Sequence, residues 1–158
     1  MENKQIDLRI HHFFDIIRAF GKESIITPHL HQHSFHKIAK LIKVDSNLKI
    51  KIVIRCDSVC EGCIYYKNGC CKDKVDHRKD FVFKEKFNNH IDKRIMGKCF
   101  INKGEVLTPV KLCQKGKLYL DNIDFIYSGN DLWHTEQRKK DVIKGLKYYS
   151  KLHNFSLQ

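Results

Sequence analysis

Five of the chain's seven cysteines stand within sixteen residues, in the stretch RCDSVCEGCIYYKNGCC. Cys60 and Cys63 form a C-x-x-C, a spacing that lets two thiolates reach one metal ion. Cys56 adds a C-x3-C in front of this pair, and KNG is a turn signal that brings the adjacent Cys70 and Cys71 back toward it. Three or four thiolates can therefore reach one centre.

This cysteine loop, residues 56–71, has three interpretations. Metal binding is favoured, because the spacing fits the ligands of zinc and iron–sulfur sites. Buried, unreactive cysteines that pack as small hydrophobic side chains are the second interpretation. A thioredoxin-like dithiol is disfavoured, because the C-x-x-C does not begin a helix in a strand–helix–strand unit.

The cysteine count and the N-terminus favour reduced thiols. Seven cysteines fit poorly with full disulfide pairing, and MENKQIDLRIHH lacks the features of a signal peptide. We therefore expect a cytoplasmic protein, in a compartment where clustered cysteines are more often metal ligands or reactive thiols than disulfides.

Composition favours one folded domain over residues 1–158. Hydrophobic residues make up 42% and charged residues 30%, and no window is apolar for long enough to suggest a membrane span. The net charge of +12 attracts nucleic acid in principle. The lysines are spread along the chain without an arginine-rich tract, so nucleic acid is a possible partner and not a favoured one.

Periodicity predicts a helix-rich α+β fold with a small sheet. The segment LKIKIVIR at residues 48–55 alternates like a half-buried strand and leads directly into the cysteine loop, which we expect to bind metal. Thr27-Pro28 gives a helix start before an apolar face that continues to residue 43. The segment LYLDNIDFIYSGN is ambiguous between strand and turn. Helices are predicted over residues 11–20, 28–43, 75–87, after Thr108-Pro109, and over about 132–151 with Asp131 as N-cap.

The histidine-rich segment HLHQHSFH falls at the start of the predicted helix 28–43. On a helix, His29, His33 and His36 share one face beside lysines, so we expect solvated side chains there rather than a second metal site. His31 falls on the apolar face, where it is either a core histidine satisfied by a backbone partner, which is favoured, or a histidine directed at the metal loop.

His11, His12 and Asp15 form another candidate group. Two imidazoles and a carboxylate suit iron, but adjacent histidines project about 100° apart on a helix, so the three are not expected to meet at one ion. We expect His12 to approach the cysteine centre and Asp15 to orient it.

The stretch LRIHHFFDIIRAFGKES, followed by a strand and then by DSVCEGC and two more cysteines, resembles an uncharacterised bacterial and archaeal family. This is the family catalogued as domain of unknown function 1284, whose members open with Leu-Arg-Pro-His-His-Leu-Leu-Cys and later carry Asp-x-Ile-Cys and a further cysteine. The resemblance covers about residues 7–112 and implies no established reaction. The positions that match the family pattern are His11, His12, Asp57, Cys60, Cys63 and one of Cys70 or Cys71.

Two departures from the family pattern bear on the site. Ile10 stands where the family has proline, and Asp15 stands where many members have cysteine. If that cysteine is a ligand in relatives, then either Asp15 replaces it as an oxygen ligand or Cys56 supplies the missing thiolate.

The sequence thus predicts a small metal-binding protein. An iron–sulfur cluster held by Cys56, Cys60, Cys63 and Cys71, with a redox or electron-transfer role and a redox partner protein, is favoured over zinc, because the second C-x-x-C of a zinc ribbon is missing. The alternative is a zinc-stabilised module that binds nucleic acid or protein. Whether the protein is an enzyme stays open, as does a ligand role for Cys99 and Cys113. All predicted metal ligands are Cys56, Cys60, Cys63, Cys70, Cys71, His12 and Asp15.

Overall fold

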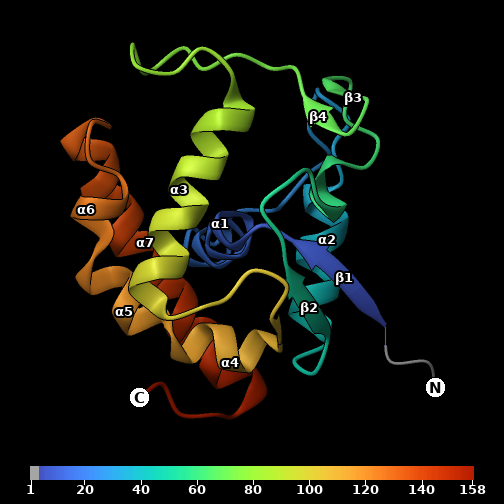
Figure 1. Ribbon diagram of the computed structural model, residues 1–158. Coiled ribbons are helices and arrows are strands. Elements are labelled where there is room, and N and C mark those ends of the chain that lie inside the picture. Colours follow the sequence, from blue (N-terminus) through green and yellow to red (C-terminus); the bar gives the residue numbers. More distant parts are fainter. Residues whose placement is uncertain (1–3) are drawn as a thin grey trace.

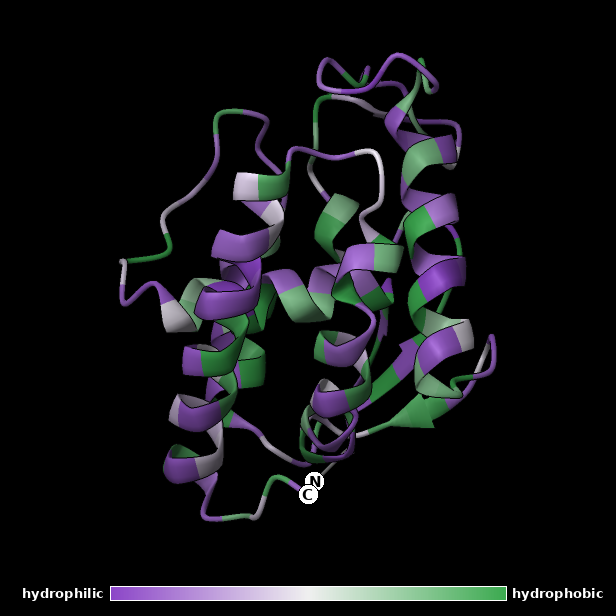
Figure 2. Cartoon of the chain, turned by 90° about the vertical axis from the view of Figure 1, so that its left-hand side faces the viewer, coloured by the Kyte–Doolittle hydropathy of each residue, from purple (hydrophilic) through white to green (hydrophobic). Residues whose placement is uncertain are grey.

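The computed structural model describes residues 4–158 and has the predicted α+β architecture, with helices packed against one another and beside a small sheet (Figure 1). Along each helix hydrophobic residues alternate with hydrophilic ones, as amphipathic helices around one core require (Figure 2). The elements are β1 (Gln5–Leu8), α1 (Ile10–Gly21), α2 (Phe35–Val44), β2 (Lys49–Ile52), the 3₁₀ turn η1 (Ser58–Cys60), β3 (Tyr66–Lys67), β4 (Cys70–Cys71), α3 (Lys84–Cys99), β5 (Val106–Leu107), α4 (Pro109–Gln114), α5 (Gly116–Asp121), α6 (Ile123–Ile126) and α7 (Leu132–His153).

The main sheet has the order β1-β2-β5, with β1 parallel and β5 antiparallel to β2. Ile6 pairs with Ile50 and Leu8 with Ile52, and all four side chains are buried. The alternation predicted for residues 48–55 is therefore confirmed, although the regular strand ends at Ile52. Directly after β2 the chain enters the cysteine loop, so the sheet fixes where that loop begins.

The helices α1 and α7 cross at two glycines. A Cβ atom on Gly21 would lie 1.8 Å from the carbonyl oxygen of Asp141, and one on Gly145 would lie 1.8 Å from that of Ile17. Because no side chain fits into these spaces, the two helix backbones touch. This contact holds α1 rigidly, and α1 carries His11 and His12 at its N-terminal end.

The predicted helix over 28–43 is wrong in its first part, because α2 begins only at Phe35. The residues before it bond to the cysteine loop instead of forming a helical ladder. The amide of Ser34 donates to the carbonyl of Val59 at 2.8 Å, and the amide of Ile64 donates to the carbonyl of His31 at 2.9 Å. These long-range bonds override the local Thr-Pro helix signal.

The predicted helix over 75–87 is also wrong in its first part, and only its last four residues are helical. Residues 72–83 have no regular helix, and α3 begins at Lys84. The apolar residues that suggested the helix serve a bend instead, where the amide of Val75 donates to the carbonyl of Val82 at 2.9 Å. Most of the helix α3, residues 88–99, was not predicted. This helix has charged and polar residues on most of its surface and a weak apolar periodicity.

The two helix starts predicted in the C-terminal half are confirmed. Thr108 caps α4 by accepting a hydrogen bond from the amide of Lys111, and Asp131 caps α7 by accepting one from the amide of His134, as expected. The ambiguous segment between them is neither strand nor turn, since it forms α5 and α6. Within residues 4–158, none of the helices combines the length and apolarity that crossing a bilayer requires.

Replacing Gly145 by alanine should lower the free energy of unfolding by about 1–3 kcal/mol or more, because the added methyl group forces α1 and α7 apart. The control is Gly97→Ala on α3, where nothing lies within 4 Å of the added Cβ and the substitution should stabilise the helix by roughly 0.5–1 kcal/mol. Urea denaturation of both variants measures the effect. Equal stability of Gly145→Ala and wild type would contradict the close crossing.

Candidate metal centre

The cysteine loop is shaped by Asp57 and Gly62. The Asp57 side chain accepts the amide of Val59 at 3.1 Å and so starts the 3₁₀ turn that carries Cys60. The amide of Cys63 then donates to the carbonyl of Cys60 at 3.0 Å, which places the C-x-x-C in a tight turn. Gly62 has a φ of +82°, and a Cβ on it would lie 2.8 Å from the carbonyl oxygen of Gln32. Glycine is therefore required where the loop passes the histidine-rich segment.

The second half of the loop is a hairpin in which β3 and β4 pair, with Lys67 opposite Cys70. Asn68 and Gly69 connect the strands with φ values of 52° and 77°, as a tight two-residue hairpin turn requires. Neighbouring residues on a strand point to opposite faces. Cys71 consequently lines the cavity described next, whereas Cys70 is not among the lining residues.

One cavity of about 430 Å³ collects most of the predicted ligands. Its wall comes from the cysteine loop, the start of α1, the histidine-rich segment and α3. Among residues 4–158, no group of three or more histidine, cysteine or acidic side chains already converges to hold a metal ion. A bound centre thus requires these side chains to turn toward a common point. The lining residues include Cys56, Cys60, Cys63, Cys71, His11, His12, Asp15, His29, His31 and His33.

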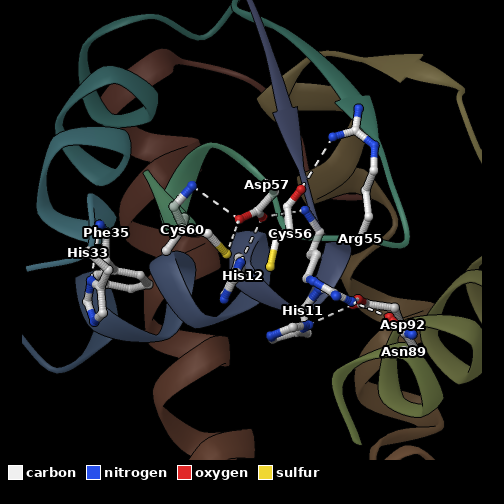
Figure 3. Close-up of polar contacts among 12 residues, drawn as sticks. His11, His12, His33, Phe35, Arg55, Cys56, Asp57, Cys60, Asn89 and Asp92 are labelled. Atoms are coloured by element: carbon white, nitrogen blue, oxygen red, sulfur yellow. Dashed lines mark hydrogen bonds and ion pairs between the residues drawn. The ribbon is translucent and has the colours of Figure 1, made fainter. Parts of the chain in front are cut away.

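Each of the two adjacent histidines is held by its own buried carboxylate. His12 Nδ1 lies 2.7 Å from Asp57 Oδ2, and His11 Nδ1 lies 2.7 Å from Asp92 Oδ1. Figure 3 shows His12 extending into the same region as the thiols of Cys56 and Cys60. With Nδ1 bonded to a carboxylate, Nε2 of His12 is the nitrogen left for a ligand.

Asp15 does not orient His12, so that expectation is wrong. Its carboxylate forms an ion pair with Arg138 of α7. Burial alone would raise the pKa of Asp15, but the charge and hydrogen bond of Arg138 together with the nearby His11 and His12 lower it. Asp15 lines the cavity as a salt-bridged side chain, and Asp57 is the residue that orients His12.

Arg9 is 1% exposed and joins the parts of the site. Its backbone amide donates to Asp57 at 2.7 Å, and its guanidinium donates to Asp92 at 2.8 Å and to Glu85 at 3.0 Å. Glu85 in turn accepts the amide of Cys71 at 3.2 Å. The cysteine loop, α1 and α3 thereby meet at one buried cation.

Burial disfavours the thiolate form of three of the cavity cysteines. Burial raises the pKa of Cys56 to about 12 and also raises the pKa values of Cys60 and Cys71. Cys56 Sγ donates to Glu85 at 3.6 Å, and Cys60 Sγ donates to Asp57 at 3.5 Å. A metal cation would supply the positive charge that thiolates need here.

The residues 29–33 of the histidine-rich segment are not helical, so His31 is not on an apolar helix face, whereas His29 is exposed as expected. The ring of His29 lies 4.6 Å from that of His31 and 4.5 Å from that of His33, between centroids. All three line the cavity, while His36 lies outside it. Desolvation, followed by the neighbouring histidines, lowers the pKa of His33 to about 4.

Cys99 and Cys113 lie in the hydrophobic core, with exposed fractions of 0% and 1%, and they do not line the cavity. Burial raises the pKa of Cys99 to about 12. Both cysteines are therefore packed core side chains and not ligands at this cavity.

The sequence analysis did not identify three residues of the site, Arg9, Glu85 and Asp92. Arg9 and Asp92 are 83 positions apart, so no local spacing connects them. The available signal was two acidic residues, Glu85 and Asp92, seven positions apart and hence on one face of a helix. That signal was hidden because the helix α3 itself was not predicted.

A scan against protein-family models finds no match to the chain. Neither the curated proteins nor the solved structures give a match. The resemblance to domain of unknown function 1284 therefore stays a prediction that rests on the quoted motifs.

Asp92→Asn should lower the free energy of unfolding by about 3–5 kcal/mol at pH 7, because it leaves the buried Arg9 with less compensating charge. Burial alone would raise the pKa of Asp92, but His11 and Arg9 together lower it. A carboxylate with a lowered folded-state pKa stabilises the fold above its unfolded pKa of about 4 and loses that contribution as the pH falls below it.

Thermal unfolding of wild type and Asp92→Asn at pH 7 and at pH 3 measures both effects. The difference between the two proteins should shrink at pH 3. The exposed Asp124→Asn serves as the control and should match wild type at both pH values. An undiminished difference at pH 3 would exclude the charge of Asp92 as the cause.

Proposed function

We propose that the protein binds an iron–sulfur cluster through Cys56, Cys60, Cys63 and Cys71. The observation that carries this proposal is that four thiols from one short loop line a single cavity. Four cysteine thiolates are the usual ligand set of [2Fe–2S] and [4Fe–4S] clusters.

The four thiols occur as two pairs. Cys56 lies near Cys60, and Cys63 lies near Cys71. A single zinc ion needs all its ligands at about 2.3 Å from one point, whereas a cluster offers separate iron atoms to separate thiols. Two pairs around a cavity of this size suit the cluster better.

Nearby cations support thiolate ligands. Arg9 lies near Cys56 and Lys84 near Cys71, and each positive charge lowers the pKa of its neighbouring thiol, although burial and the nearby carboxylates of Glu85 and Asp73 raise these pKa values more. The protein would supply ligands, burial and hydrogen bonds near sulfur, which together set the potential of a redox centre. A redox partner protein would then exchange electrons with it.

Zinc is the second candidate, because His12 is oriented by Asp57 in the manner of a zinc-ligating histidine. In that case the site would stabilise a module that binds nucleic acid or protein. For both candidates we keep the cytoplasm as the expected compartment, since all seven cysteines are free thiols.

Cys71→Ser should abolish or strongly reduce bound iron, because it removes a thiol that lines the cavity. Cys70→Ser is the matched control, because Cys70 lies on the same strand as Cys71 but does not line the cavity. Iron and sulfide analysis with visible spectra of anaerobically purified protein measures the difference. Colourless wild-type protein with stoichiometric zinc would refute the cluster, and equal iron loss in both variants would refute the assignment of Cys71.

His12→Gln should leave the iron content unchanged, because the proposed cluster has four cysteine ligands without it. Loss of bound metal from His12→Gln, with retention in His11→Gln, would instead favour the zinc site with His12 as a ligand. Metal analysis of both variants, with circular dichroism as a control for folding, distinguishes the two outcomes.

A further inference from the structure

The helix α3 separates its charges between two faces. Its two acidic residues, Glu85 and Asp92, point inward, where both bond to Arg9. At 100° per residue, Lys86, His90, Lys93 and Gly97 fall together on the opposite, outer face. Because both carboxylates of α3 bond to Arg9, none lies on the outer face of the helix.

Four cations on or beside this face lack acidic partners. Lys86, Lys93 and Lys98 are exposed and Arg94 is half-buried. Among residues 4–158, none of the four forms an ion pair with a carboxylate. These four positive charges are therefore not compensated by a carboxylate of the described residues.

A groove of about 460 Å³, open to solvent, lies on this face between α3 and Phe125 of α6. Figure 1 shows α6 beside α3. Phe125 of α6 forms one side and is 48% exposed. The guanidinium carbon of Arg94 lies 4.5 Å from the Phe125 ring centroid, and Lys98 Nζ lies 4.8 Å from it. Nothing lies within 4 Å of a Cβ placed on Gly97, so the middle of the groove is open down to the helix backbone.

A second aromatic side chain stands at the end of α3. Phe100 is 76% exposed, and its φ of 54° and ψ of 50° place it in the left-handed region, where glycine is the common residue. An exposed phenyl ring and an unfavourable backbone conformation both cost stability. The Phe100 ring is thus an exposed apolar surface at the C-terminal end of α3.

We propose that the outer face of α3, formed by Lys86, Lys93, Arg94, Gly97 and Lys98 with Phe125, binds single-stranded nucleic acid. The cations contact phosphates, and the exposed aromatic rings offer surfaces on which unpaired bases stack. Bases in a duplex are already stacked, so the aromatic rings favour the single strand. This activity is separate from the proposed metal centre, since none of these residues lines the cysteine cavity.

The test uses the full-length protein and a fluorescein-labelled oligothymidylate of about 16 nucleotides. Fluorescence anisotropy gives the Kd at several salt concentrations. Gly97→Glu places a carboxylate in the groove, and Gly97→Gln adds a side chain of nearly the same shape without the charge. Both variants should fold, because the position is exposed and open.

The logarithm of the wild-type affinity should fall with the logarithm of the salt concentration with a slope of about −3, which corresponds to four cations on a single strand. Gly97→Glu should weaken binding at least about tenfold, because like charges then face the phosphates. Gly97→Gln should bind as wild type. Equal weakening by both variants, no binding at low salt, or equal affinity for a duplex of the same length would overturn the proposal.

Two further arms separate this proposal from other interpretations. Cys71→Ser should bind the oligonucleotide as wild type does, so that failure of the metal proposal leaves this one standing, whereas loss of binding would overturn the assignment to α3. Binding to phosphatidylserine vesicles without binding to the oligonucleotide would also overturn it, in favour of a membrane surface.

Discussion

The burial of Arg9 is the constraint on which the site depends. A guanidinium that is 1% exposed needs compensating charge, and Asp92 and Glu85 of α3 provide it. The same residue fixes Asp57 through its backbone amide. Because one cation draws on both the cysteine loop and α3, the positions of the cavity walls are set together rather than one by one.

The sequence predicted the parts of the fold whose signals are local. The face of α1, the alternation around β2 and the caps of α4 and α7 all depend on neighbouring residues, and the structure confirms them. The start of α2 was missed because hydrogen bonds from the cysteine loop compete with the helix there. The helix α3 was missed because it buries a charged pair, so its inner face does not look apolar.

For the site, spacing identified the cysteines but not their surroundings. Cys71 and Cys70 are equivalent in sequence, and only the pleat of the hairpin distinguishes them. Asp57 entered through the family resemblance without a role, which the structure gives as the orientation of His12. The histidine-rich segment was assigned to solvent because a helix was assumed, whereas bonds to the loop bring three of its rings to the cavity.

The strands β1 and β2 are paired in the sheet, but in the sequence they are separated by α1 and α2. The chain must therefore cross back before the small sheet exists, and the carboxylates that hold Arg9 come later still, on α3. During synthesis from the N-terminus, the thiols of the cysteine loop emerge from the ribosome well before their buried surroundings are complete. The nascent chain would then carry exposed thiols until α3 docks.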